Sequence, residues 1–187
     1  MKHLAIFASG EGTNAQQIID HFNGSDVKIG LVVCNNPSAN VLNRAKKHNI
    51  PSFLINKNSF YKSDEVLKRL IVEKIDLIVC AGFMWKIPDN LIHAFPNRII
   101  NIHPALLPKF GGKGMYGMNV HKAVIEAGEK ESGITIHFIN EHYDEGKIIF
   151  QAICEIQKED TPETLAQKVH QLEHNCFPKT IEQLLKK

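Results

Sequence analysis

Residues 4–22 read LAIFASGEGTNAQQIIDHF, and this stretch decides the fold class. The apolar run Leu4–Ala8 is typical of a strand whose two faces are both covered. After a glycine-containing turn, apolar residues return with the spacing of a single helix face, at Ala15, Ile18, Ile19 and Phe22. A buried strand, a glycine loop and a helix in this order form the first half of a βαβ unit.

The alternation of strands and helices continues through the next eighty residues. Short apolar runs predict further strands, and periodic segments predict helices between them. We expect strands at residues 27–34, 53–55, 77–80 and 98–102, and helices at 41–48 and 63–74, the last capped by Ser63 with Asp64 and Glu65 in its first turn. Such an order indicates a parallel sheet with helices on both of its faces.

The pattern changes after residue 118. We expect a helix capped by Asn119, and then a strand over residues 134–138 whose alternation predicts two unlike faces. A polar loop leads to a strand over 148–156, which should pair antiparallel with it, and a last helix starts at Thr161-Pro162. We therefore predict an α/β fold in a single Rossmann-like, doubly wound domain over residues 1–187, with a mostly parallel sheet and an antiparallel C-terminal addition.

The composition of the chain argues against several classes of partner. The net charge is +2 with no basic cluster, whereas nucleic-acid binding needs clustered positive charge, so we expect no nucleic-acid partner. The N-terminus is too short and polar for a signal peptide, and no apolar run could span a membrane. The sequence thus predicts a cytoplasmic protein without membrane attachment. Four cysteines form no Cys-x-x-Cys pair, and Cys34 and Cys80 end apolar runs, which suits structural thiols.

The loop Ala8–Asn14 is a candidate phosphate site. Glycines allow close approach of the backbone, and the following helix offers free N–H groups and a positive dipole end. A dinucleotide site is the competing interpretation, but Ala15 stands at the third glycine position and Cys34-Asn35-Asn36 supplies no acid for a ribose. A plain glycine turn is the third possibility.

Polar residues end the strand over 98–102. Asn101 and His103 share one face, at the carboxyl end of a buried strand, where ligands bind in this architecture. An amide can donate to a developing oxyanion, and an imidazole can carry a proton. Asp144, in the loop before Gly146, can balance a histidine's charge. Alternatively, His103 is a hydrogen-bonded strand-end histidine, and Asp144 is a turn residue.

These motifs together resemble the folate-dependent formyltransferase family, in its phosphoribosylglycinamide branch. The resemblance covers nearly the whole chain and rests on residues 9–14 (SGEGTN), 81–84 (AGFM), 101–109 (NIHPALLPK) and 144–146 (DEG). It implies transfer of a formyl group from 10-formyltetrahydrofolate, as co-substrate, to the amine of phosphoribosylglycinamide. The partners would be small-molecule substrates of a monomer or weak homodimer. No metal is expected, because His121, His137 and His142 lie on different predicted elements.

The resemblance also implies residue roles. Asn101, His103 and Asp144 would be catalytic. The ribonucleotide's phosphate and ribose would be bound by Gly12, Thr13, Asn14, His170 and Glu173. The folate would be bound by Met84, Trp85, Lys86, Ile87, Asn140, Glu141, His142 and Tyr143. Trp85-Lys86 stands where the family often has an arginine, and the glycine-rich residues 110–118 are either an exposed loop or a mobile lid.

Other functions remain open from the sequence. A methionyl-tRNA formyltransferase should carry a further C-terminal tRNA-binding domain and a basic surface, and a formyl-folate hydrolase should carry an extra N-terminal domain. A non-catalytic phosphate-ligand-binding domain of the same fold is the alternative outside the enzymes, and the joint presence of Asn101, His103 and Asp144 argues against it.

Overall fold

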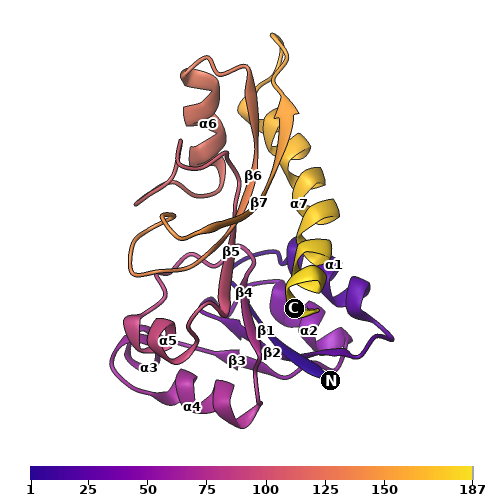
Figure 1. The fold of residues 1–187 in the computed structure, drawn as a ribbon, viewed down its shortest axis with the longest axis vertical. Helices are drawn as coiled ribbons and strands as arrows, with labels where there is room; N and C mark the ends of the chain where they lie inside the picture. Colours follow the sequence, from indigo (N-terminus) through magenta and orange to yellow (C-terminus); the bar gives the residue numbers. More distant parts are fainter. Residues whose placement is uncertain (187) are drawn as a thin grey trace. The chain divides into compact units, whose positions relative to one another are not determined.

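A computed structural model describes residues 1–186, so residue 187, the last of the expected domain, lies outside the described part (Figure 1). The strands are β1 (Lys2–Ala8), β2 (Val27–Cys34), β3 (Ser52–Leu54), β4 (Leu77–Cys80), β5 (Ile99–His103), β6 (Glu131–Phe138) and β7 (Ile148–Glu155). The helices are α1 (Thr13–Phe22), α2 (Val41–Lys47), α3 (Lys57–Tyr61), α4 (Glu65–Val72), α5 (Asp89–Ala94), α6 (Met118–Glu126) and α7 (Pro162–Leu185).

The strands hydrogen-bond in the order β3-β2-β1-β4-β5-β6-β7. β1 pairs in parallel with β2 and β4, β2 pairs in parallel with β3, and β6 and β7 are antiparallel. The predicted α/β class, with a mostly parallel sheet and an antiparallel C-terminal addition, is confirmed. β1 reverses the strand order relative to the chain, because β2 and β4 lie on its two sides, and ligands in such sheets bind beyond the carboxyl ends of strands at that point.

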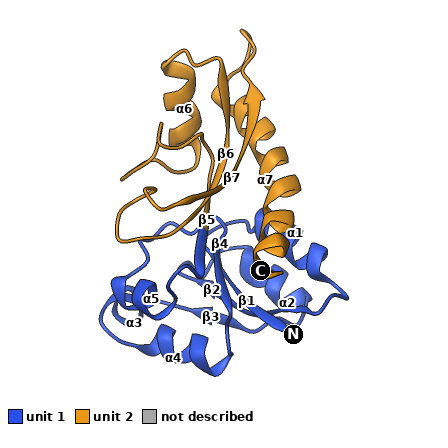
Figure 2. Ribbon diagram, in the orientation of Figure 1, with its two compact units in different colours: residues 1–100 blue, residues 101–187 orange. Residues whose placement is uncertain are grey.

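The chain divides into two compact units, residues 1–100 and the part from Asn101 onward (Figure 2). In the first unit, β1, β2 and β4 form the core, and the run Leu4–Ala8 is wholly inaccessible to solvent. Helices α1 and α2 pack on β2, whose apolar run Leu31–Cys34 is wholly buried. Cys34 and Cys80 are buried free thiols, as predicted.

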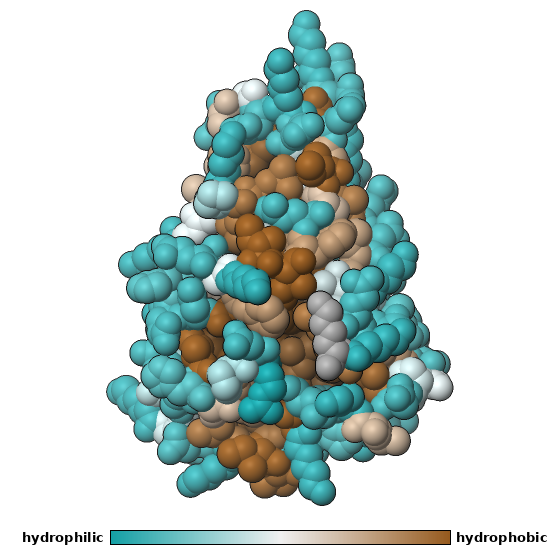
Figure 3. Space-filling view, viewed as in Figure 1, coloured by the Kyte–Doolittle hydropathy of each residue, from teal (hydrophilic) through white to brown (hydrophobic). Residues whose placement is uncertain are grey.

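In the second unit, α7 packs on β6 and β7. The two faces of β6 differ in chemistry, as predicted, with Thr135 and His137 on one face and Ile134 and Ile136 on the other, but both faces are buried. Polar side chains can occupy a covered face where hydrogen bonds satisfy them. β7 instead leaves Ile148, Phe150 and Ile153 partly exposed, and apolar surface gathers in the upper part of Figure 3.

Several element boundaries differ from the sequence predictions. Helix α6 is capped by Gly117, whose positive φ of 53° turns the chain into the helix, and not by Asn119, whose side chain donates to the Gly114 carbonyl. Asp64 is the N-cap of α4, while the Ser63 hydroxyl accepts a bond from the Glu65 N–H. The short helices α3 and α5 were not predicted. Over the described residues, the helices include none that is long and apolar enough to cross a membrane.

Candidate active site

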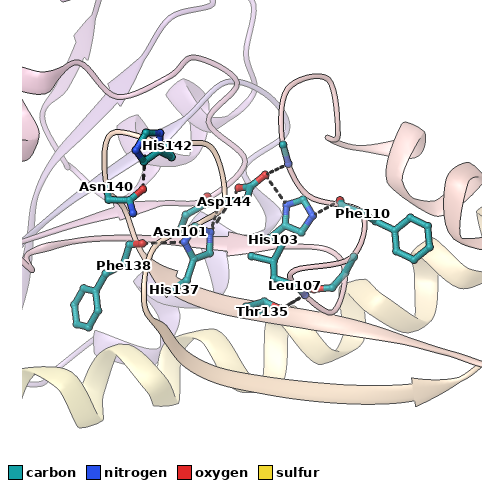
Figure 4. A network of polar contacts seen from close by, with 12 residues as sticks. Asn101, His103, Leu107, Phe110, Thr135, His137, Phe138, Asn140, His142 and Asp144 are labelled. Carbon is teal, nitrogen blue, oxygen red and sulfur yellow. Dashed lines mark hydrogen bonds and ion pairs between the residues drawn. The ribbon is translucent and has the colours of Figure 1, made fainter.

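The polar end of β5 lies in the second unit and begins the candidate site (Figure 4). His103 is 3% exposed, and Asn101 is half-buried. The His103 Nε2 lies 2.8 Å from the Phe110 carbonyl oxygen. Because a carbonyl only accepts, Nε2 carries the proton in this bond, and Nδ1 is left to accept a proton or to remain neutral. The Nδ1 is therefore the one nitrogen of this imidazole that is left for a further contact.

Asp144 faces that nitrogen. Its Oδ2 lies 3.7 Å from His103 Nδ1, within ion-pair distance but longer than a hydrogen bond. The same oxygen accepts a 2.9 Å bond from the Gly112 N–H, which ties the glycine-rich loop to the carboxylate. Asp144 has a φ of +56°, a strained conformation for a residue with a side chain, and strain of this kind concentrates at functional sites.

His137 completes the group, although no role was predicted for it. Its Nδ1–H donates to the Phe138 carbonyl at 2.9 Å, so its Nε2 can accept the 3.2 Å bond from the Asn101 Nδ2. Asp144 Oδ1 lies 3.6 Å from the same Nε2. Burial lowers the pKa of His137, and the bond to Phe138 and the charge of Asp144 only partly oppose this. A neutral His137 thus orients the Asn101 amide. The alternating polar positions of β6 were the signal for it.

Two features of the backbone hold this network in place. The buried Thr135 hydroxyl donates to the Ala105 carbonyl at 2.7 Å and accepts from the Leu107 N–H at 2.9 Å, fixing the chain that leaves β5. Gly146 lies so close to β6 that an added Cβ would be 1.7 Å from the Phe138 carbonyl oxygen. Only glycine permits this approach, so Gly146 closes the loop that carries Asp144.

The predicted phosphate loop lies in the first unit. Gly12 is the N-cap of α1 with a φ of 70°, and a Cβ there would approach the Val41 side chain to 2.7 Å. No side chain caps α1 within the described part of the chain, and its first turn holds no acid. The positive end of the α1 dipole therefore faces the loop at Gly12, as an anion site requires.

The predicted folate segment 84–87 also lies in the first unit. The Met84 N–H donates to Ser9 Oγ at 2.9 Å, so this segment is bonded to the loop after β1. Trp85 lines a groove of about 450 Å³ with Leu54 and Asn56. Lys86 and Ile87 instead line a second groove, of about 570 Å³, with residues 61–64.

The remaining predicted site residues lie in the second unit. In the loop after β6, the Asn140 side chain accepts a 3.0 Å bond from the His142 N–H, while Glu141, His142 and Tyr143 are exposed. On α7, His170 is exposed and Glu173 is 6% exposed, so this carboxylate is held inside the fold, as predicted.

A histidine group on α6 and α7 was also missed. The His170 ring stacks on that of His174, with centroids 6.4 Å apart, and contacts the buried His121 at 6.5 Å. The His-x-x-x-His spacing of residues 170–174, which places both rings on one helix face, was the signal. Across residues 1–186, no three histidine, cysteine or acidic side chains are grouped so that they could hold a metal ion.

Comparison with known proteins gives one family. A model of the formyl transferase family matches residues 2–181. The phosphoribosylglycinamide formyltransferase of Bacillus subtilis is 39% identical over 99% of this chain and 95% of its own length. The chloroplastic phosphoribosylglycinamide formyltransferase of Arabidopsis thaliana is 40% identical over 96% of this chain, which spans 64% of that relative. The crystal structure of glycinamide ribonucleotide transformylase 1 from Geobacillus kaustophilus, 38% identical, superposes with a TM-score of 0.90 and 99% coverage of both chains.

Proposed function

The chain belongs to the formyl transferase family, and we propose that it transfers the formyl group of 10-formyltetrahydrofolate to the amine of 5-phosphoribosylglycinamide, a step of de novo purine synthesis. The observation that carries the proposal is the position of Asp144 within 3.7 Å of His103 and 3.6 Å of His137, beside the Asn101 amide. A neutral amide donor, a titratable imidazole and a balancing carboxylate are the groups that direct acyl transfer needs.

The reaction is a direct acyl transfer. The glycinamide nitrogen attacks the formyl carbon, which creates a tetrahedral intermediate with a negatively charged oxygen. The second N–H of the Asn101 Nδ2 donates to that oxygen, and the positive charge of a doubly protonated His103 stabilises it. Asp144 balances the imidazolium from the Nδ1 side. The bond from the formyl carbon to the folate N10 then breaks, and the proton lost by the amine reaches N10, with Asp144 assisting. Removing one such oxyanion donor typically raises the barrier by about 3–4 kcal/mol.

Substrate binding follows the chemistry of each segment. Gly12, Thr13 and Asn14 bind the ribonucleotide phosphate through the uncapped start of α1. Glu173 accepts hydrogen bonds from the ribose hydroxyls, with His170 beside it. The folate is bound by residues 84–87 and 140–143. No metal takes part, and the protein works in the cytoplasm as a monomer or weak homodimer.

A formylation assay with competing acceptors tests the proposal. The purified protein is given 10-formyltetrahydrofolate with glycinamide ribonucleotide, with methionyl-tRNA or with no acceptor, and release of tetrahydrofolate is followed by absorbance. We expect release only with the ribonucleotide, matched by formylated product. Release that depends on the tRNA would indicate a methionyl-tRNA formyltransferase, and release without an acceptor would indicate a hydrolase. No release in any mixture would favour a non-catalytic domain.

A further inference from the structure

Strand β7 ends the sheet with an edge that no other strand covers. In the strand order it has β6 as its single neighbour within residues 1–186 (Figure 1). A bare edge presents unpaired N–H and C=O groups, and proteins usually protect it with charges, proline or a very short strand. β7 has eight residues, no proline, and one charged residue, Glu155, at its end. Its free edge is therefore suited to pairing with a further strand.

The regular part of this edge is the segment 150–156. An extra residue shifts the register with β6 just before it, and at its far end the Ile156 N–H donates to the Lys130 carbonyl at 2.9 Å. Peptide groups in an antiparallel strand alternate in direction, so three residues of the segment direct theirs away from β6, namely Gln151, Ile153 and Glu155. The Glu155 carbonyl agrees with this direction, because it accepts a 3.3 Å bond from the Lys168 Nζ. Its second lone pair can still accept a backbone bond.

The side chains of the segment 150–156 are symmetric about Ile153. Moving outward from that residue, the two sides match as a small pair, a polar pair and a large apolar pair: Ala152 and Cys154, Gln151 and Glu155, Phe150 and Ile156. If two copies of the segment paired antiparallel about a two-fold axis at Ile153, each residue would lie opposite its counterpart. The interface of a symmetric dimer requires a surface that is complementary to itself in this way.

Ile153 is the residue that gains most from such pairing. It is 58% exposed, the most exposed apolar side chain of β7. Its neighbour across the ladder in β6 is Gly133, which provides no side chain for it to contact. At the two-fold axis the Ile153 side chains of two copies would lie directly opposite each other, and cross-strand pairs of β-branched side chains stabilise antiparallel sheets. A second copy would thus supply the neighbour that β6 lacks.

We propose that two copies of this chain associate through the free edge of β7, antiparallel and with Ile153 opposite Ile153, so that the sheet continues across the dimer. A second copy fits better than an unrelated strand, because the symmetry of residues 150–156 matches the segment to itself. Seven residues on each side are far fewer than the roughly 20–30 of a stable interface, so the dimer is weak, with a dissociation constant in the micromolar range or above. The dimer does not depend on formyl transfer.

Sedimentation equilibrium tests the association, over a range from about 5 to about 500 µM that brackets a weak dissociation constant. The average mass of the wild type should rise with concentration toward that of two chains. Ile153→Lys places like charges opposite each other at the axis and should weaken association at least roughly tenfold, while turnover per chain stays unchanged. Ile71→Lys, at a residue of α4 that is 60% exposed, is the matched control and should associate like the wild type. A wild type that remains a single chain throughout, or equal weakening in both variants, would overturn the proposal.

Disulfide cross-linking tests the register without a disruptive charge. Ile153→Cys and Glu155→Cys are compared in a Cys154→Ser background, which removes the native free thiol of β7. In the proposed register the two Cα atoms at position 153 lie about 5.5 Å apart, within the range of a disulfide. Those at position 155 lie about 14 Å apart, because each is two residues from the axis. Mild oxidation should therefore give a covalent dimer of Ile153→Cys and little of Glu155→Cys. Equal cross-linking of both variants, or none of Ile153→Cys, would rule out this interface.

Discussion

The two units differ in the kinds of side chains that they bury. In the first unit, β1, β2 and β4 are buried by apolar side chains on both faces, and Ser59 on α3 is the one polar residue buried among residues 1–100. The second unit buries seven polar residues, His103, His121, Ser132, Thr135, His137, Glu173 and Thr180. Apolar burial specifies a stable scaffold, whereas buried polar groups provide chemistry only where bonds position them. The difference indicates that the proposed catalytic chemistry belongs to the second unit.

Removing the proposed catalytic groups is the most direct test of whether the chemistry belongs to the second unit. His103→Ala, or Asp144→Asn, should reduce turnover by roughly a hundredfold or more, the usual scale for acid–base groups. Asparagine at position 144 can still accept the bond from the Gly112 N–H, so it removes the charge and leaves the loop held. Turnover is measured by tetrahydrofolate release, and folding by urea denaturation.

Asp160→Asn is the matched control for that experiment. Asp160 forms a 2.5 Å ion pair with Lys168 elsewhere in the second unit, so its loss should leave turnover nearly unchanged. Turnover near the wild-type value in either His103→Ala or Asp144→Asn would rule out the catalytic assignment.

Two opposite substitutions compare how polar and apolar burial contribute to stability in the two units. Thr135→Val removes a hydroxyl that also accepts a 2.8 Å bond from Gln151, and it leaves the Leu107 N–H and the Ala105 carbonyl unpaired. Val79→Thr places a new hydroxyl in β4, where Val79 is fully buried. Each should lower the free energy of unfolding by about 2–3 kcal/mol in urea titrations. If Thr135→Val left the free energy of unfolding unchanged, the hydrogen bonds of the buried Thr135 hydroxyl would not stabilise the second unit.

A substitution in the predicted phosphate loop should change substrate affinity without lowering stability. Thr13 is exposed at the first position of α1, and Thr13→Asp puts a carboxylate where the phosphate is proposed to bind. Affinity for the ribonucleotide should fall roughly 10- to 30-fold by charge repulsion, while the helix dipole favours the new charge. Asn58→Asp, an exposed position in the first turn of α3, is the control. If both variants bound the ribonucleotide equally tightly, the assignment of the phosphate site to this loop would be wrong.

Most of the scaffold could be predicted from the sequence because apolar runs and helical periodicity are local signals. β2 and β4 were predicted with their observed bounds, and the Pro162 start of α7 was also predicted. Interior polarity was not predictable in the same way: whether Thr135 or His137 faces water depends on what covers β6, which sequence alternation does not specify. The meeting of Asp144 with His103 depends on a loop closed by Gly146, and only the family resemblance suggested it.

The smallest expected effect is a pH dependence that arises from three histidines of the second unit. Burial lowers the pKa of His121, His137 and His174. With native pKa values below the unfolded value of about 6.5, the unfolded chain binds more protons below that pH, so stability falls as pH drops from 6.5 toward the native values. At pH 6 the loss should be under about 1 kcal/mol per histidine, because an unfolded histidine is then only about three-quarters protonated. Urea titrations at pH 7.5, 6.5 and 5.5 measure it, and protection from hydrogen exchange should weaken in β6 before it weakens in β1. His121→Leu should flatten the slope, and an unchanged slope would mean that His121 binds as many protons in the native state as in the unfolded state.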